Sequence, residues 1–298
     1  MSENGATERA VDRVGFIGLG NMGKPMARGL TSWRGGLTVC DIRPGATDKF
    51  VEHGARAAAD PAELAAETAV ICVTVLDDAQ VTDVVTGPRG ILATATPGTV
   101  IAVHSTIGDR TAERLAAVCA ERGVEFVDAP VSGGAGAAKQ GTLAVMAGGT
   151  PAAIERIREP FGCFADLIVH AGPVGAGTRM KLARNLLHFV AFTAATEAQR
   201  LAEASGLDIT ELGTVVRHSD AITGGPGSIM LRDTTAPIPP DDPWYSVLGH
   251  VRDLGEKDLT LATELGARLD VPLPLAELAL TRFADGLGVP TGIERQEA

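Results

Sequence analysis

Two polar side chains, Lys181 and Asn185, have the spacing needed to act together on one small molecule. They are four residues apart, so on a helix they project from one face, one turn apart. A lysine amine has an ordinary pKa near 10.4, so it needs burial or a neighbouring positive charge to accept a proton near neutral pH, whereas its ammonium form donates one directly. The pair suits proton transfer, although spacing alone favours a solvent-exposed helix face.

A glycine-rich turn near the start of the chain has the spacing of a dinucleotide phosphate site. It lies between an apolar run, residues 14–19, and an amphipathic stretch. In such a turn the first glycine permits the tight bend, the second lets a pyrophosphate approach the backbone, and the third lets the helix pack on the strand. The N–H groups of the helix start then face the phosphates. The expected cofactor-binding residues are Gly18, Gly20, Asn21, Met22 and Gly23.

An acidic residue ends the next apolar run. Asp41 lies 23 residues beyond Gly18, where a carboxylate can accept hydrogen bonds from an adenosine ribose and would repel a ribose 2′-phosphate. Arg43 follows two residues later, and a guanidinium there could pair with that phosphate instead. The alternative for Arg43 is an exposed turn residue before Pro44. We therefore expect NAD, with NADP not excluded.

Two further segments follow apolar runs. In Ser132-Gly133-Gly134, a hydroxyl and exposed amides precede a small-residue helical stretch and could hold a carboxylate, although a turn that merely needs glycine is the alternative. Thr106 follows a predicted strand at a position where ligands collect in α/β folds. A helix N-cap at Ser105 or Thr106 is an equally consistent interpretation.

Four segments together carry a family resemblance. They are GFIGLGNMG at residues 15–23, DAPVSGG at 128–134, GAG at 175–177 leading to Lys181 and Asn185, and KDL at 257–259. In this order the sequence resembles the β-hydroxyacid dehydrogenase family, which includes 3-hydroxyisobutyrate dehydrogenases and tartronate semialdehyde reductases. The four segments span nearly the whole chain, and their combination is more specific than any one of them.

The resemblance implies a role for each matching residue. Lys181 would be the general acid or base at a substrate hydroxyl, and Asn185 would help to position that substrate. Residues 132–134 would bind the substrate carboxylate, Thr106 would lie near the nicotinamide, and Lys257 would reach the cofactor and substrate. The expected activity is reversible hydride transfer between a nicotinamide cofactor and a small 3-hydroxy acid.

Two other functions stay open at this point. An imine reductase of related architecture is the nearest enzymatic alternative, but those relatives commonly lack the lysine that Lys181 matches. A nucleotide-binding regulatory module without catalysis is the second alternative, and such a chain should also have lost the lysine. The sequence does not distinguish among particular hydroxy acids.

The order of the predicted elements indicates how these residues are held. Short apolar runs alternate with amphipathic stretches up to about residue 171, which predicts a Rossmann-type doubly wound, mostly parallel sheet. A long helix over residues 178–204, on the order of 40 Å, then joins it to an all-helical second domain with helices at 209–217, 248–268 and 275–287 and a proline-rich loop at 234–243. We expect a disordered tail at 1–11, a dinucleotide-binding domain at 12–174 and a helical domain at 175–298. The predicted strands are Val14–Leu19, Leu37–Asp41, Ala69–Thr74, Thr99–His104, Val124–Ala129, Leu143–Ala147 and Leu167–His170, and the predicted helices between them include Met22–Trp33, Asp109–Arg122 and Pro151–Phe161.

Composition limits the partners and the location. A net charge of −11 and a pI near 5.0 argue against nucleic acid or an anionic membrane, and no apolar run approaches the roughly 18 residues that span a bilayer. Four scattered cysteines without metal spacing suggest buried thiols in a reducing cytoplasm, and the histidines form no HxxxH pair, so no metal is expected. The long helix is consistent with a homodimer or a higher homo-oligomer.

Overall fold

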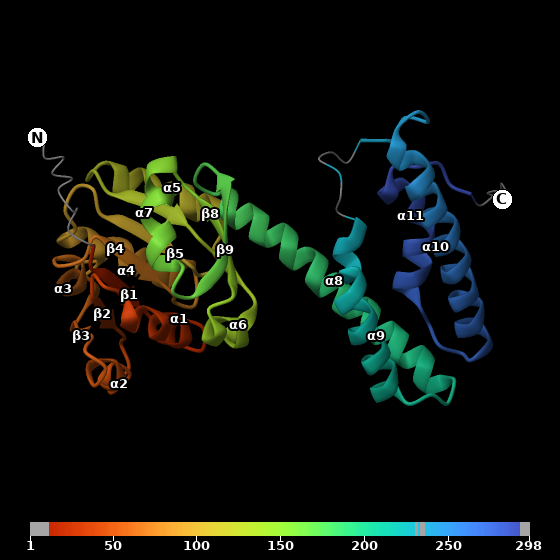
Figure 1. Ribbon diagram of the computed structural model, residues 1–298, viewed down its shortest axis with the longest axis horizontal. Coiled ribbons are helices and arrows are strands. Elements are labelled where there is room, and N and C mark those ends of the chain that lie inside the picture. The colour runs from red at the N-terminus through yellow and green to blue at the C-terminus, as the bar shows by residue number, and fades with distance from the viewer. Residues whose placement is uncertain (1–11, 230–231, 233–235, 293–298) are drawn as a thin grey trace, which may run out of the picture. The chain divides into compact units, whose positions relative to one another are not determined.

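The computed structural model describes residues 12–229, 232 and 236–292, and it divides into two compact units after Arg184 (Figure 1). Unit 1 contains, within these residues, a nine-stranded sheet in the order β3-β2-β1-β4-β5-β6-β8-β7, with β9 beside β8. Neighbouring strands are parallel from β3 through β6, whereas β8 is antiparallel to β6 and β7. The strands are β1 (Val14–Ile17), β2 (Leu37–Cys40), β3 (Arg56–Ala57), β4 (Val70–Val73), β5 (Val100–Val103), β6 (Glu125–Asp128), β7 (Val131–Ser132), β8 (Leu143–Gly148) and β9 (Ala165–Gly172).

The central strands end level with one another. Ile17 is aligned with Cys40 of β2 and with Val73 of β4, and Val73 is aligned with Val103 of β5. Because parallel strands bring their carboxyl ends to the same edge of a sheet, the residues that follow these four strands share that edge. The chain order reverses between β2 and β4 on either side of β1, which is where such sheets bind nucleotides.

Helices cover both faces of the sheet. Phe16 faces a core that includes Met26 and Phe161, whereas its neighbour Ile17 faces a core that includes Leu64 and Leu115. Burial on both faces explains why the strands read as uniform apolar runs. The predicted Rossmann-type fold is confirmed. The helices of unit 1 are α1 (Gly23–Gly29), α2 (Asp48–Val51), α3 (Pro61–Ala65), α4 (Asp78–Thr86), α5 (Asp109–Ala120), α6 (Gly134–Gln140), α7 (Pro151–Phe161) and the start of α8 (Ala176–Ala204).

A buried histidine, His104, directly follows β5. The ring of His104 packs against Phe16, Phe161 and Phe164, and its Nδ1 lies 2.8 Å from the carbonyl oxygen of Ala129. Burial lowers the pKa of His104 to about 4, so the ring is neutral at neutral pH. A neutral ring then donates from Nδ1 to Ala129. His104 is therefore a structural residue of the core.

Unit 2 is helical, as predicted. It contains the rest of α8 together with α9 (Ile209–Thr223), α10 (Pro243–Arg268) and α11 (Pro274–Leu287). The expected start of α10 at residue 248 is wrong, because the carboxylate of Asp242 accepts the N–H of Trp244 at 2.8 Å and Pro243 suits a first helical turn. The predicted loop is present at 236–242, and residues 234 and 235 lie outside the described residues, as does the predicted tail at 1–11.

A small core and buried carboxylates, among them Glu197, stabilise unit 2. Among the described residues, Ile238, Leu248, Leu287 and Val289 form a buried apolar cluster in this unit. Glu197 of α8 is 5 % exposed, and its two oxygens accept the N–H groups of Leu275 and Ala276 at 2.8 and 3.0 Å. These two residues begin α11, so Glu197 satisfies donors that have no partner inside that helix.

Two sequence expectations concern thiols and membranes. The four cysteines are free, and all but the half-buried Cys163 are buried, as the sequence suggested. Along the described part of the chain, no helix combines the length and the apolar character that crossing a membrane requires.

Candidate active site

The glycine turn after β1 has a different steric demand at each glycine. Gly18 has a φ of +90°, and a Cβ there would lie 2.1 Å from the carbonyl oxygen of Thr74. A Cβ at Gly23 would lie 1.9 Å from the carbonyl oxygen of Gly18. At Gly20, by contrast, a Cβ would meet no atom within 4 Å. The fold therefore requires glycine at 18 and 23, whereas position 20 faces open space, as close approach of a pyrophosphate demands.

Asp41 follows β2 and is tied to this turn. Its carboxylate accepts the N–H of Leu19 at 2.6 Å and three N–H groups of Arg43 at 2.8–2.9 Å. Burial by itself would raise the pKa of Asp41, but these donors outweigh it and lower the pKa to about 2. The side chain of Asp41 is 5 % exposed and that of Arg43 is 58 % exposed. A charged carboxylate thus lies beside the turn, and a guanidinium covers it from the solvent side.

Two apolar residues at the same edge were missed in the sequence. Ile42, after β2, is 97 % exposed, and Leu76, after β4, is 80 % exposed. Both strands flank β1, so these side chains stand on either side of the strand that carries the glycine turn. The available signal was an apolar residue in a turn that is otherwise polar. Exposed apolar side chains at a ligand-binding edge are candidates for contact with a flat aromatic ring.

Ser105 and Thr106 follow β5 at this edge and differ in accessibility. The hydroxyl of Ser105 is buried, accepting the N–H of Val75 at 2.9 Å and donating to its carbonyl oxygen at 2.6 Å. Thr106 is exposed. The N-cap of α5 is Gly108, so the alternative that Ser105 or Thr106 caps a helix is wrong. Ser105 joins two loops, and Thr106 is the member of the pair that a ligand could reach.

The segment Ser132-Gly133-Gly134 forms the junction between β7 and α6. Gly133 and Gly134 have φ values of +128° and +70°, a backbone that L side chains rarely adopt. Both glycines are exposed and Ser132 is half-buried. The conformation explains why glycine occurs twice, and the exposure leaves the backbone of this turn accessible.

Lys181 and Asn185 lie on α8, as expected, and both are half-buried, as is His188 one further turn along. Burial lowers the pKa of Lys181, with a smaller contribution from the positive charge of Arg184. Among the described residues, Lys181 has no hydrogen bond or ion pair. The amine of Lys181 is therefore partly shielded from solvent and loses its proton more readily than the amine of a fully solvated lysine.

The remaining expected residue, Lys257, belongs to α10 in unit 2, whereas the glycine turn, Asp41, Thr106 and residues 132–134 belong to unit 1. The side chain of Lys257 is 60 % exposed, and its amine lies 3.1 Å from the carboxylate of Asp258. Within unit 2, Lys257 thus forms an exposed ion pair with its neighbour on α10.

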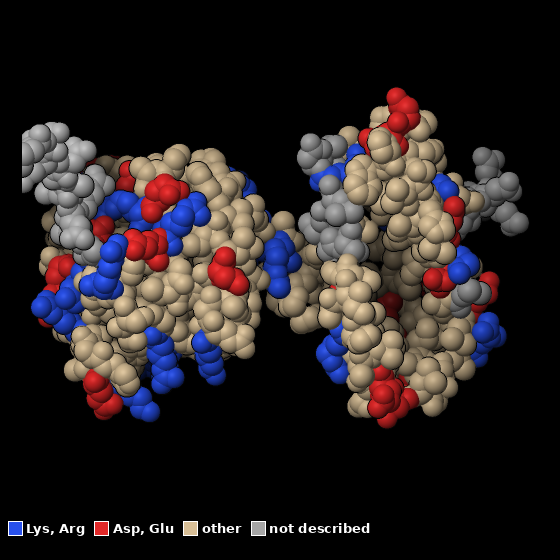
Figure 2. Space-filling model, in the orientation of Figure 1, with Lys and Arg blue, Asp and Glu red and all other residues tan. Residues whose placement is uncertain are grey.

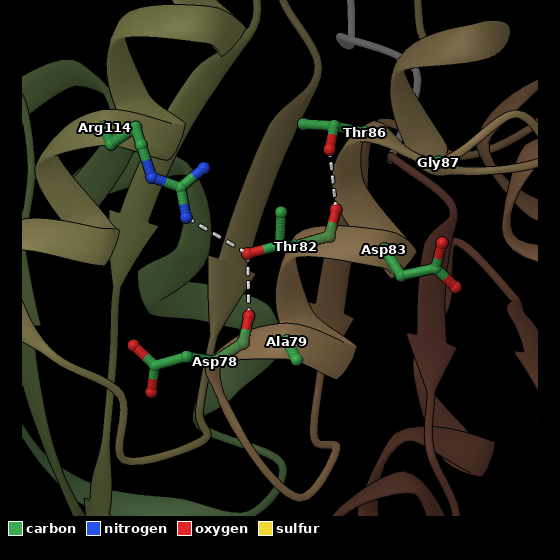
Figure 3. Close-up of a pocket in the computed structure, with 7 residues that line it drawn as sticks. All are labelled: Asp78, Ala79, Thr82, Asp83, Thr86, Gly87 and Arg114. Carbon is green, nitrogen blue, oxygen red and sulfur yellow. Dashed lines mark hydrogen bonds between the residues drawn. The ribbon is translucent and has the colours of Figure 1, made fainter.

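A surface groove lies between α4 and α5 and contains none of the expected site residues (Figure 3). Arg114 of α5 donates to the hydroxyl of Thr82 on α4 at 3.2 Å, across this groove. In the part of the chain that the structure describes, no three His, Cys, Asp or Glu side chains gather as a metal site would require. The groove is lined by Asp78, Ala79, Thr82, Asp83, Thr86, Gly87 and Arg114.

Known proteins match both parts of the chain. Residues 13–172 match the NAD-binding domain of 6-phosphogluconate dehydrogenase, and residues 175–288 match the NAD-binding family of NADP-dependent 3-hydroxyisobutyrate dehydrogenase. An uncharacterized oxidoreductase of Mycobacterium tuberculosis is 58 % identical over 278 residues, which is 93 % of this chain and 94 % of that protein. The 2-(hydroxymethyl)glutarate dehydrogenase of Eubacterium barkeri is 34 % identical over 288 residues, which is 96 % of this chain and 93 % of that protein.

A solved structure from Mycobacterium avium 104 superposes with a TM-score of 0.89 at 54 % identity, covering 93 % of this chain and 99 % of the other. The fold, the glycine turn and these matches define a nicotinamide-dependent oxidoreductase. Within that class, the chain belongs to the β-hydroxyacid dehydrogenase family of 3-hydroxyisobutyrate dehydrogenase type.

The glycine turn yields a matched pair of substitutions. Gly20→Ala should leave thermal unfolding unchanged but raise the Kd for NADH on the order of tenfold, about 1.4 kcal/mol, because its methyl group enters the open space where we expect the phosphates to bind. Gly23→Ala should instead cost about 1–3 kcal/mol of unfolding free energy through overpacking. Gly249→Ala, also in open space but in unit 2, is the control. Unchanged NADH affinity in Gly20→Ala, measured by fluorescence titration, would remove this turn from the cofactor site.

Proposed function

We propose that the protein reversibly oxidises a small 3-hydroxy acid, with hydride transfer to a nicotinamide cofactor and Lys181 as the general acid or base. The observation that carries the proposal is the state of the Lys181 amine, which is half-buried, has no ion-pair partner among the described residues, and has a lowered pKa. Membership of a family of hydroxyacid dehydrogenases supports it.

The mechanism divides the work between cofactor and chain. A nicotinamide cofactor, held at the glycine turn, would supply the hydride chemistry. The neutral amine of Lys181 takes the hydroxyl proton during oxidation, and its ammonium form returns that proton during reduction. Asn185, one turn along α8, orients the reacting group with its amide. Residues 132–134 would hold the substrate carboxylate, Thr106 would contact a bound nicotinamide, and Lys257 would bind the cofactor or the substrate.

The substrate class follows from these two polar anchors. A carboxylate at residues 132–134 and a hydroxyl at Lys181 select an acid whose oxidisable carbon is close to its carboxyl group. The relative from Eubacterium barkeri bears the name of a dehydrogenase for such an acid. Lys181 also favours this reaction over imine reduction, because the related imine reductases commonly lack the matching lysine. It favours catalysis over a regulatory module, which needs no group that exchanges a proton.

Replacing Lys181 tests the central claim. Lys181→Ala should lower kcat by roughly 10²–10⁴-fold, the usual contribution of a positioned acid or base, while the Kd for NADH stays unchanged. The measurement is NADH absorbance with a panel of 3-hydroxy acids, and Lys49→Ala, at an exposed lysine of α2, is the control. Equal turnover in Lys181→Ala and the wild-type protein would exclude the proposed role.

The same group predicts the pH dependence. The neutral amine is the active form in oxidation, so kcat/KM should rise with pH and level off above a pKa that is lower than that of an ordinary lysine, since burial and Arg184 lower the pKa of Lys181. Rates measured in overlapping buffers should show this rising limb in the wild-type protein and lose it in Lys181→Ala. A limb retained in the variant would assign the titration to another group.

We also propose that NAD is preferred over NADP, with Asp41 accepting the ribose hydroxyls and Ile42 and Leu76 flanking the adenine. The carboxylate of Asp41 is charged and already oriented by Leu19, which supports a site for a neutral ribose. Arg43 is mostly exposed and is the group that could instead meet a 2′-phosphate.

Cofactor preference can be reversed in part by one substitution. Asp41→Ala should shift the ratio of kcat/KM for NADP to that for NAD upward by roughly tenfold or more, because Arg43 loses its carboxylate partner and becomes available to the 2′-phosphate. Arg43→Ala should move the ratio the other way, and Arg34→Ala, at another exposed arginine, should not move it. A wild-type protein that favours NADP at equal concentration would contradict the assignment to Asp41.

We further propose two functional domains, residues 12–174 and 175–298, a cytoplasmic location and a homodimer or higher homo-oligomer. Four free thiols support a reducing compartment. Uncovered apolar side chains on α8 and α9 support self-association, including Leu186, Phe189, Phe192 and Ile222 at 69, 59, 54 and 74 % exposure. Figure 2 shows wide uncharged areas on the visible face of unit 2.

The oligomer has a direct test by light scattering after gel filtration. The wild-type protein should have at least twice the mass of one chain. The double variant Phe189→Glu, Phe192→Glu should have the mass of one chain, because carboxylates in place of the two rings oppose burial in an interface. Arg217→Glu, an exposed change on α9, is the control. A wild-type monomer would refute the proposed assembly.

A further inference from the structure

The first turn of α8 is held by a carboxylate from a distant strand. Asp128 ends β6 and is fully buried. One of its oxygens accepts the N–H of Gly175 at 2.7 Å and the other accepts the N–H of Thr178 at 2.6 Å. These are donors that a helix start leaves without partners of its own. Asp128 therefore joins the carboxyl end of β6 to the beginning of α8, across 47 and 50 residues of sequence.

The backbone around this carboxylate is packed without spare room. A Cβ at Gly177 would lie 2.3 Å from the carbonyl oxygen of Met146 and 2.5 Å from that of Asp128. A Cβ at Gly148 would lie 2.4 Å from an oxygen of the Asp128 side chain. The first turn of α8 thus lies directly on the backbone of β6 and β8, and only a small displacement is open to it.

Lys181 is fixed by this anchored turn. It follows Thr178 by three residues and Gly177 by four, so it lies on the same side of α8, one turn further on. The groups that shift the pKa of Lys181 are its own burial and Arg184, and Asp128 is not among them. Asp128 therefore influences the amine through the position of the helix rather than through its charge.

Asp128 differs from the ordinary helix caps of this chain. Asp60, Asp77 and Asp208 cap α3, α4 and α9 from the adjoining residue. Asp128 instead reaches from another element, and burial raises its pKa even though the N–H groups of Thr178 and Gly175 favour the charged form. Burying a carboxylate to cap a helix start costs free energy. What distinguishes Asp128 from the other caps is that it fixes the first turn of α8 from another element of the fold.

We propose that Asp128 is the positioning residue for the catalytic amine: its two hydrogen bonds fix the first turn of α8, and thereby the placement of Lys181 relative to the reacting hydroxyl. This inference rests on the proposed function, because it assigns a consequence to the position of Lys181. A displacement on the order of 1 Å at a reacting group costs roughly 10²-fold in rate, so a modest shift of the turn has a measurable effect.

The test uses two variants and a matched control in the full chain. Asp128→Asn keeps the shape of the side chain. Its amide has only one acceptor oxygen, so one of the two backbone N–H groups loses its hydrogen-bond acceptor. Gly148→Ala keeps the charge and displaces the carboxylate, so it decides the question if Asp128→Asn does not fold. Asp60→Asn, at a cap in the same unit that does not touch α8, is the control.

Kinetics and chemical labelling give independent readouts. In Asp128→Asn, kcat should fall roughly 10–100-fold with the KM for NAD unchanged, and the rising pH limb should move, whereas Asp60→Asn should match the wild-type protein. The rate at which acetic anhydride acetylates Lys181, followed by mass spectrometry, should change severalfold in Asp128→Asn alone.

The outcomes separate the two proposals. If no hydroxy acid is turned over by the wild-type protein, the proposed function fails, and the acetylation rate still decides whether Asp128 positions Lys181. If turnover is present but kcat, the pH limb and the acetylation rate are all unchanged in folded Asp128→Asn and Gly148→Ala, the positioning role is wrong. A loss of melting temperature with unchanged kcat and labelling would likewise assign Asp128 a structural role only.

Discussion

The level register of β1, β2, β4 and β5 is the constraint on which the site in unit 1 depends. Because Ile17, Cys40, Val73 and Val103 are aligned, the residues that follow them begin at one edge. The hydrogen bond from Leu19 to Asp41 and the pair between Ser105 and Val75 are consequences of this alignment. A shift of one residue in any of these strands would turn its side chains to the opposite face and break those bonds. The chemistry at the edge is thus secured by apolar packing on the two faces.

Buried carboxylates secure the helical part of the architecture. Asp128 serves the start of α8 and Glu197 serves the start of α11, each with both oxygens on backbone N–H groups. Neither is adjacent in sequence to the helix that it serves. Apolar contacts fix how deeply a helix is buried but tolerate sliding, whereas two short charge-assisted bonds specify one position. This division between packing and directional bonds explains why the chain contains a few buried acids.

Sequence patterns were sufficient for the features that depend on local spacing. Strands buried on both faces read as apolar runs, and the glycine turn with Asp41 could be assigned because its parts lie within 23 residues of one another. The two-residue strand β3, at Arg56 and Ala57, is exposed and carries no periodic signal. Asp128 was visible only as part of a family segment, because a bond spanning 47 residues leaves no local pattern. Lys181 could be located by spacing, but its weakened proton affinity depends on burial that only the fold supplies.

The placement of the cysteines has a consequence for redox chemistry. Cys40 and Cys119 lie beneath the helices, and burial raises the pKa of their thiols to about 11 and about 12. Burial also raises the pKa of Cys72 and Cys163. Because the thiolate is the form that peroxides and electrophiles attack, these sulfurs are nearly inert at neutral pH. The fold thus protects its own thiols from oxidation for as long as they stay buried, so their reactivity reports on local unfolding.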